Sequence, residues 1–117
     1  MEQRGAFYED CAVTFLTLKG YKVLKRNFRS YCGEIDIVAR DKEAIVFVEV
    51  KARSTDFRVS GLEAVDRRKR ERLRKTALAY TSSNPDGFFR FDVLEIIQGQ
   101  SFRQYNLIKA AFTMDEE

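Results

Sequence analysis

Apolar residues recur along this chain at two different spacings, which predict a helix near the amino terminus and strands after it. Between residues 6 and 18 the spacing is that of one helix face, with apolar side chains at Phe7, Cys11, Phe15 and Leu18, widened by Ala12 and Leu16. Gly20 ends this predicted helix. Residues 21–28, 34–40 and 44–52 predict three strands, the last two joined as a hairpin by the polar sequence RDKE.

The second half of the chain predicts one more helix and two more strands. The helix covers residues 67–83, and its inward face carries Leu73, Ala77 and Tyr80. Its candidate N-cap residues are Asp66 and Ser60. After the breaker SSNPDG, residues 88–97 predict a strand, residues 102–108 a strand or extended arm, and the tail from Lys109 a short helical turn before a frayed acidic end. The order αβββαββ predicts an α/β fold, a mixed sheet flanked by helices, in one domain over residues 1–117.

Three charged residues interrupt the apolar hairpin and raise the question of why charge is placed there. Side chains alternate along a strand, so Glu49 and Lys51 share one face with their Cβ atoms roughly 7 Å apart. A turn of two or of four residues pairs Asp36 with Glu49 or with Phe47, and both registers put Asp36 on the same face as Glu49. We therefore expect two carboxylates and one ammonium group to converge.

Two carboxylates in a partly dehydrated site repel each other unless one takes up a proton or a cation lies between them. Oxygen-only ligands suit Mg²⁺, or Mn²⁺ in its place, better than zinc. Such an ion can activate water and neutralise a phosphate oxygen, and Lys51 can stabilise the charge that develops on phosphorus. The alternative is that Asp36, Glu49 and Lys51 form a structural ion pair at a strand end.

Composition removes several other chemistries. The 117 residues include two cysteines and no histidine, which excludes a Cys/His zinc site and any mechanism that needs imidazole. Cys11 and Cys32 are interpreted as unpaired thiols of the core. The sequence contains neither a signal peptide nor an apolar run long enough to span a membrane, so the expected location is the cytoplasm and no membrane partner is expected.

Positive charge is concentrated in two segments, which indicates a polyanionic partner. KGYKVLKRNFR (19–29) has five basic residues and no acid, and RRKRERLRK (67–75) has seven basic residues and one acid. Basic residues spread around this second helix, so some of them must face outward as a ridge that contacts phosphates. The predicted nucleic-acid-binding residues are Arg67, Arg68, Lys69, Arg70, Arg72 and Arg74. No helix or ribbon is evident that would aim side chains at base edges, which favours recognition of DNA by shape rather than sequence. Tyr31 and Phe57 are candidates for stacking on an unpaired base, although a core or surface role is the simpler interpretation.

The hairpin and its flanking blocks resemble a known family. GEIDIVARDKEAIVFVEVK (33–51), preceded by GYKVLKRNFR and followed by GLEAV and FRFDV, resembles the YraN family of small bacterial proteins. That family is similar to the PD-(D/E)XK nuclease superfamily and, within it, to archaeal Holliday-junction resolvases. The resemblance covers nearly the whole chain and implies a restriction-endonuclease-like fold. It also implies that Asp36 and Glu49 bind the metal and that Lys51 is the catalytic lysine.

The same resemblance assigns roles to two residues on the helices. Glu9 matches the helical glutamate that completes the metal site in resolvase-like proteins, while its position also suits an ordinary acid near a helix amino terminus. Lys69 matches a polar residue near the active site. Ile35 stands where the motif's name has proline, a departure that is frequent in the superfamily. Glu34 is either a supporting acid or, as we favour, an outward residue, and Asp92 is predicted to be a hydrogen-bonded structural acid.

These observations lead to two hypotheses of different classes. The first is a Mg²⁺-dependent or Mn²⁺-dependent DNA phosphodiesterase that acts as a homodimer, because one site per chain needs a symmetric partner to cut two strands. The second is a non-catalytic module that keeps a nuclease fold and binds nucleic acid or another protein. A structural protein whose acids only form ion pairs is a third reading.

Overall fold

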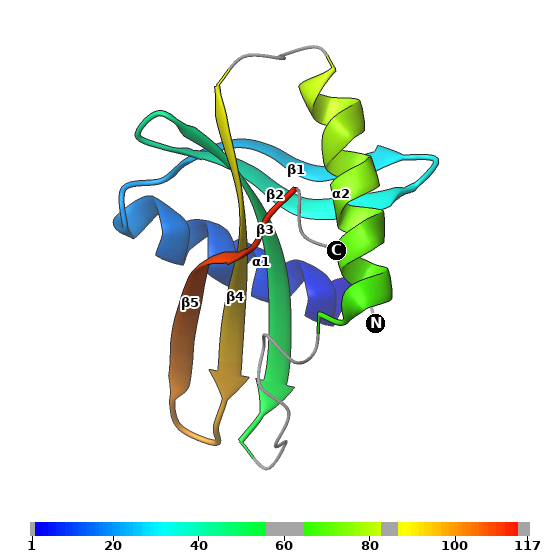
Figure 1. The fold of residues 1–117 in the computed structure, drawn as a ribbon. Coiled ribbons are helices and arrows are strands. Elements are labelled where there is room, and N and C mark those ends of the chain that lie inside the picture. The colour runs from blue at the N-terminus through cyan, green and yellow to red at the C-terminus, as the bar shows by residue number, and fades with distance from the viewer. Residues whose placement is uncertain (1, 56–64, 83–86, 115–117) are drawn as a thin grey trace.

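The structure, a computed structural model, describes residues 2–55, 65–82 and 87–114, with side chains from residue 5 onward. Two helices and five strands follow in the order predicted from the sequence (Figure 1). Their bounds are α1 Glu2–Leu18, β1 Lys22–Ser30, β2 Gly33–Asp41, β3 Ala44–Ser54, α2 Arg67–Thr81, β4 Phe88–Gln98 and β5 Arg103–Phe112. The predicted α/β class and the order αβββαββ are confirmed.

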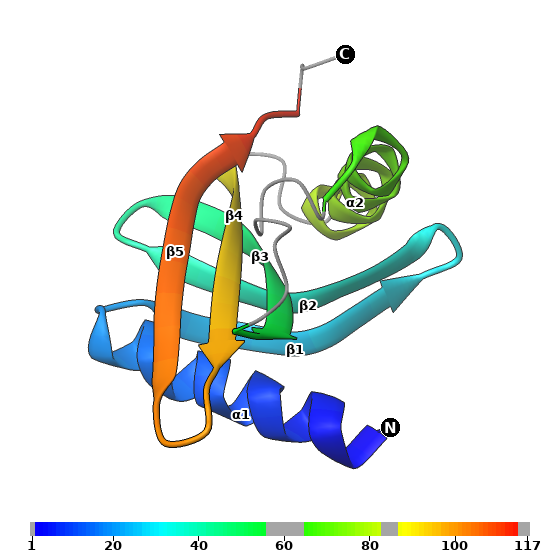
Figure 2. The ribbon, with the colours of Figure 1, turned by 90° about the horizontal axis from the view of Figure 1, so that it is seen from below.

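One mixed sheet in the order β1-β2-β3-β4-β5 forms the centre of the molecule. Strands β3 and β4 are parallel, and every other neighbouring pair is antiparallel. Parallel neighbours need a crossover connection, and the segment that contains α2 supplies it. Helix α1 covers one face of the sheet and α2 the other (Figure 2), so the sheet has an apolar core on each side.

Helix α1 buries a different stripe from the one predicted. Its buried side chains are Tyr8, Ala12 and Leu16, whereas Phe7 is 46% exposed and Leu18 is 82% exposed. Two adjacent stripes of this helix are apolar, and periodicity alone does not choose between them. Ala12 lies in the centre of the buried stripe and is fully buried.

The cysteines are also less buried than predicted. Cys11 and Cys32 are free thiols of intermediate exposure, and Cys11 packs against the edge of the core under α1. The expectation that both lie inside the core is therefore corrected.

Helix α2 agrees closely with its predicted pattern. Leu73 and Ala77 are buried and Tyr80 packs against the same core. The Asp66 side chain accepts a hydrogen bond from the Lys69 backbone N–H at 2.9 Å, which settles the N-cap in favour of Asp66. Ser60 and Phe57 lie outside the described residues.

The carboxyl-terminal segment is more extended than predicted. Strand β5 continues to Phe112, so the helical turn predicted from Lys109 is wrong. The Phe112 ring stacks on Phe91 of β4 with centroids 4.6 Å apart, and this contact stabilises the end of β5 on the sheet. The register between β4 and β5 shifts near Asp92, where Ala110 has a φ of 52°.

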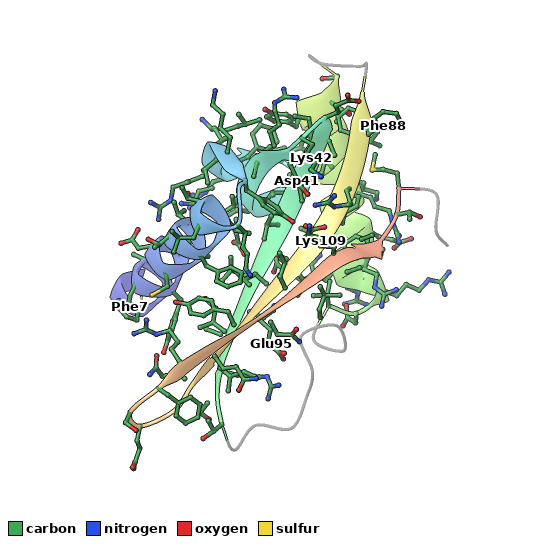
Figure 3. The ribbon with its side chains drawn as sticks, turned by 90° about the vertical axis from the view of Figure 1, so that its left-hand side faces the viewer. Phe7, Asp41, Lys42, Phe88, Glu95 and Lys109 are labelled. Carbon is green, nitrogen blue, oxygen red and sulfur yellow. The ribbon has the colours of Figure 1, made fainter. Side chains whose placement is uncertain are left out.

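A buried polar network lies at this shift in register, and Asp92 is its centre. Asp92 accepts hydrogen bonds from the Tyr21 hydroxyl at 2.8 Å, from the Arg90 guanidinium at 2.9 Å and from the Ala110 backbone N–H at 3.0 Å. Asp41 extends the network, with an Arg90 nitrogen at 2.9 Å and the Lys109 ammonium at 3.6 Å (Figure 3). The prediction that Asp92 is a hydrogen-bonded structural acid is confirmed.

No helix among residues 2–55, 65–82 and 87–114 is long and apolar enough to cross a membrane.

Candidate active site

The two hairpin carboxylates meet where the pairing of β2 with β3 ends. The hairpin has a two-residue turn, since Asp41 pairs with Ala44, and the pairing runs as far as Ile37 with Val48. Extending this register by one step places Asp36 opposite Glu49, which is the two-residue alternative foreseen from the sequence. Beyond this point the Val50 backbone N–H donates its hydrogen bond to Asp36 Oδ2 at 2.8 Å. The Asp36 carboxylate therefore replaces a main-chain partner and is held at the split between the strands.

Two ammonium groups approach the Glu49 carboxylate from different elements. Lys69, in the first turn of α2, places Nζ 2.7 Å from Glu49 Oε2, and Lys51, two residues further along β3, places Nζ 3.5 Å from the same oxygen. The Glu49 side chain is only 7% exposed. The Asp66 N-cap fixes the start of α2 and hence the position of Lys69.

A cavity of about 210 Å³ opens beside these groups, between the β1–β2 hairpin and α2. Its lining is Gly33, Glu34, Asp36, Glu49, Lys69, Arg72 and Leu73. Gly33 brings the hairpin close to α2, because a Cβ at this position would lie 3.2 Å from Thr76 Oγ1 and the glycine φ is 154°. Sequence reasoning did not single out Gly33; its only signal was a glycine directly before a strand that carries two acids.

The electrostatics of the cavity follow from burial and from like charges. Burial and the charge of Glu49 raise the pKa of Asp36 to about 7, against the opposing hydrogen bond from Val50. Burial also lowers the pKa of Lys51, although Glu49 counteracts it. Burial disfavours the charged form of Lys69 as well, but the charge and hydrogen bond of Glu49 outweigh it and raise the pKa of Lys69.

The donor set fits a divalent cation held by two carboxylates. Asp36 and Glu49 offer only oxygen ligands, and the repulsion that raises the pKa of Asp36 is the repulsion that a cation would relieve. Mg²⁺ usually keeps several waters and takes one or two protein carboxylates, so the adjoining cavity suits its remaining ligands.

Glu9 does not join the two hairpin acids. Its Oε1 accepts hydrogen bonds from Arg26 at 3.3 Å and from Asn27 at 3.1 Å, although its charge contributes to the raised pKa of Asp36. Within the described part of the chain no three acidic or thiol side chains gather closely enough to ligate one ion. The expected third ligand is thus turned toward β1. Glu34 is exposed and lies 3.6 Å from Arg29, and it also lines the cavity that holds Asp36 and Glu49.

The basic side chains of α2 divide into two groups, one exposed and one turned toward the carboxyl-terminal segment. Arg74 is buried and its Nε donates to the Thr113 carbonyl at 2.7 Å, while Arg70 Nε donates to the Val65 carbonyl at 3.0 Å. Both guanidinium groups also lie over the Phe112 ring. The helical spacing of four residues turns this pair toward the carboxyl-terminal segment. The exposed members of the predicted set are Arg67, Arg68 and Arg72.

Comparison with known proteins identifies the family of this chain. The family model described as "Uncharacterised protein family UPF0102" matches residues 8–96. The chain belongs to the UPF0102 family, also called the YraN family. A UPF0102 protein of Sulfurihydrogenibium is 45% identical over 106 residues, covering 89% of this chain and 92% of its own. UPF0102 proteins of Clostridium botulinum and Clostridium acetobutylicum are 43% and 40% identical, covering 92% and 91% of this chain and 92% and 88% of their own.

The UPF0102 match includes every residue of the candidate site. Asp36, Glu49, Lys51 and Lys69 fall within residues 8–96, as does Glu9. The names of the relatives give the family and no activity, so the function of a UPF0102 protein has to be argued from the site itself.

The raised pKa of Asp36 predicts an unusual pH dependence for this UPF0102 protein. The pKa is about 7 in the folded chain against 3.8 for a fully solvated aspartate side chain, so between these values the folded state binds more protons than the unfolded state. The contribution of Asp36 to stability is therefore complete below about pH 3.8 and is lost as the pH rises toward 7.

Asp36→Asn removes this titration and keeps an oxygen for the Val50 N–H. We expect urea unfolding in EDTA to show the variant gaining stability relative to the unmodified protein as the pH rises from 5 to 8. Glu34→Gln, at the exposed rim of the same cavity, serves as the matched control and should follow the unmodified protein. If the free energy of unfolding varied with pH in the same way for Asp36→Asn and the unmodified protein, the raised pKa of Asp36 would be contradicted.

Proposed function

We propose that this protein hydrolyses phosphodiester bonds of DNA with the help of a divalent cation. The observation that carries the proposal is the convergence of Asp36 and Glu49 at the end of the β2–β3 pairing, next to Lys51 and an open cavity. Placing two repelling carboxylates and two lysines in a partly buried site lowers the stability of the fold. The same groups match what phosphate hydrolysis requires.

Each residue of the site has a part in this proposal. Asp36 and Glu49 would hold Mg²⁺ or Mn²⁺, which when bound supplies an acidified water and neutralises charge on the phosphate. Lys51 orients the attacking water and stabilises the negative charge that grows on the phosphoryl oxygens. Water attacks phosphorus in line, the bond to the 3′ oxygen breaks, and a 5′-phosphate and a 3′-hydroxyl remain.

The substrate is bound through its backbone. Arg72 lines the cavity, and Arg67 and Arg68 are exposed on the same helix, where they can contact flanking phosphates. Such contacts fix position without reading sequence, so we propose recognition by DNA structure. A homodimer would supply two sites for the two strands of a duplex or branched substrate.

One observation favours a second candidate function. Lys69 already neutralises Glu49 at 2.7 Å, and Glu9 is turned to Arg26 and Asn27. A module that only binds nucleic acid would need no cation, and this ion pair would then be its stable state. In the catalytic proposal, by contrast, Lys69 moves from Glu49 to a substrate phosphate when the ion binds.

A cleavage assay decides between the two candidates. Labelled single strands, blunt duplexes, flaps, forks and four-way junctions are incubated with Mg²⁺, with Mn²⁺ and with EDTA. We expect metal-dependent cleavage that leaves a 5′-phosphate on at least one branched or single-stranded substrate. Absence of cleavage on all of them, together with retained DNA binding, would support the binding module and overturn the catalytic proposal.

Thermal denaturation with Mn²⁺ tests the metal site without any substrate. An ion that binds only the folded chain stabilises it by RT ln(1 + [ion]/Kd), or about 2.7 kcal/mol at a hundredfold excess over Kd. We expect a Tm increase of several degrees in the unmodified protein and none in Asp36→Asn. Equal shifts in the two proteins would place Mn²⁺ elsewhere.

A further inference from the structure

A second concave surface lies beside the carboxylate cavity, on the far side of the β1–β2 hairpin tip. It is a groove of about 530 Å³ lined by Tyr31, Cys32, Lys75, Leu78 and Ala79. Figures 1 and 2 show the hairpin reaching alongside α2, which supplies the last three of these residues. Tyr31 is 99% exposed and Leu78 is 55% exposed. An aromatic ring and a large aliphatic side chain thus face water across one groove.

A third concave surface lies between the groove and the carboxylate cavity. A shallow depression along the hairpin tip is lined by Arg29, Ser30, Tyr31, Cys32, Gly33 and Glu34. It shares Tyr31 and Cys32 with the groove, and Gly33 and Glu34 with the cavity that holds Asp36 and Glu49. Gly33 and Thr76 meet between the cavity and the groove, so a ligand that occupies both would follow the depression along the hairpin tip.

The chemistry along this path changes in the order that a nucleotide chain requires. The cavity offers Lys69 and Arg72 to a phosphate, and the groove offers the face of Tyr31 and the aliphatic atoms of Leu78 and Ala79. Lys75 adds positive charge at the apolar end and Arg29 at the hairpin tip. Aromatic stacking combined with nearby cations is how proteins bind unpaired bases without reading sequence.

We propose that this groove binds an unpaired nucleobase of the strand whose phosphate enters the carboxylate cavity, with Tyr31 stacking on the base. The inference rests on the proposed function and specifies its substrate class: DNA with a single-stranded stretch next to the cleaved bond, as in flaps, forks and single strands. A base inside a continuous duplex is stacked on its neighbours and is not available to Tyr31. The positive charge of Lys75 and Arg29 favours the base of a polyanionic strand over a protein segment.

The chain contains no tryptophan, so Tyr31→Trp introduces a single indole as a reporter. Its fluorescence is recorded during titration with oligothymidylate in EDTA, where no hydrolysis takes place. We expect saturable quenching, because the indole stacks on a thymine. Leu18→Trp is the matched control. Leu18 is the last residue of α1, is 82% exposed and lies directly before the basic segment 19–29, outside the groove. Its indole should stay unquenched over the same range.

Truncation of the ring measures its contribution to affinity. Stacking on one base accounts for about 1–3 kcal/mol, so Tyr31→Ala should weaken oligothymidylate binding by roughly 5-fold to 150-fold, and Tyr31→Phe should restore it. Affinity for a blunt duplex should change by less than about twofold, since phosphate contacts dominate that binding. The near-complete exposure of Tyr31 predicts an unchanged Tm for both variants.

Three results would overturn the inference: equal quenching at positions 31 and 18, unchanged oligothymidylate affinity in Tyr31→Ala, or sedimentation that shows Tyr31→Ala converting a dimer into a monomer. The last result would assign the groove to a second copy of this chain. These outcomes are separate from those of the cleavage assay. Quenching without hydrolysis would support the base-binding site and refute the nuclease. Hydrolysis without quenching would support the nuclease and refute the base-binding site.

Discussion

Glu49→Gln is expected to reduce metal-dependent DNA cleavage by at least about a thousandfold. The substitution keeps the size of the side chain but removes one of the two carboxylates that would hold the cation. The cation is expected to supply several kcal/mol of transition-state stabilisation, and each 1.4 kcal/mol corresponds to a factor of about ten in rate. Single-turnover cleavage of the preferred substrate in Mg²⁺ measures the loss.

The same variant should bind DNA as tightly as the unmodified protein, or more tightly. Glu49 neutralises Lys69 at 2.7 Å and Lys51 at 3.5 Å, and glutamine leaves both ammonium charges available to phosphate. Fluorescence anisotropy with a labelled oligonucleotide in EDTA measures this affinity. Loss of cleavage with equal or stronger binding separates a catalytic carboxylate from one that only supports the fold.

Glu34→Gln is the control for Glu49→Gln. Glu34 lines the same cavity, but its side chain is 41% exposed and lies 3.6 Å from Arg29. The charge change is identical, so we expect cleavage within about threefold of the unmodified protein, because exposed charge pairs contribute little. Equal losses in the two variants would mean that net charge near the cavity, and not ligation by Glu49, controls the reaction.

The central part of this site was predictable because it lies on one hairpin. Strand alternation fixes the faces of Glu49 and Lys51, and both possible turns put Asp36 beside Glu49. Local rules were therefore sufficient, and only the choice between the two registers needed the structure. The Asp66 N-cap and the inward face of α2 are equally local features, and both were identified.

The remaining differences come from contacts between distant segments. Glu9 has helical spacing that allows either role, and in the structure it accepts hydrogen bonds from Arg26 and Asn27 of β1. Arg74 was among the predicted nucleic-acid-binding residues, but its Nε donates a hydrogen bond to the carbonyl of Thr113, which is distant in the sequence. Which of the two apolar stripes of α1 is buried likewise depends on how the helix packs on the sheet. A one-dimensional pattern contains none of these partners.

Asp92→Ala is expected to destabilise the protein more than any other single change discussed above. The Asp92 side chain is fully buried, and it accepts hydrogen bonds from Tyr21, Arg90 and Ala110. Alanine leaves the Tyr21 hydroxyl and the Ala110 N–H without this acceptor, and the Arg90 guanidinium keeps Asp41 as its carboxylate partner. Removing one partner of a buried ion pair costs about 3–5 kcal/mol, which is a large share of the roughly 5–15 kcal/mol that stabilises a typical domain.

The loss should be visible as a decrease in Tm of roughly 10–25 °C, since about 1 kcal/mol corresponds to several degrees for a domain of this size. Urea unfolding monitored by circular dichroism gives the free energy directly. Asp41→Ala is the matched control, because Asp41 binds the same Arg90 at 2.9 Å from a more exposed position. Asp41→Ala should lower the free energy of unfolding by about 1 kcal/mol or less.

The two variants remove a carboxylate from the same arginine, so the difference between them measures the burial of Asp92 together with its hydrogen bonds from Tyr21 and Ala110. Asp92 ties β4 to the shifted register of β5 through the Ala110 N–H, and Asp41 makes no such main-chain contact among the described residues. A larger decrease in Tm for Asp41→Ala than for Asp92→Ala would show that the exposed half of the network supports the fold. The shift in register at Ala110 would then need another cause, most directly the stacking of Phe112 on Phe91.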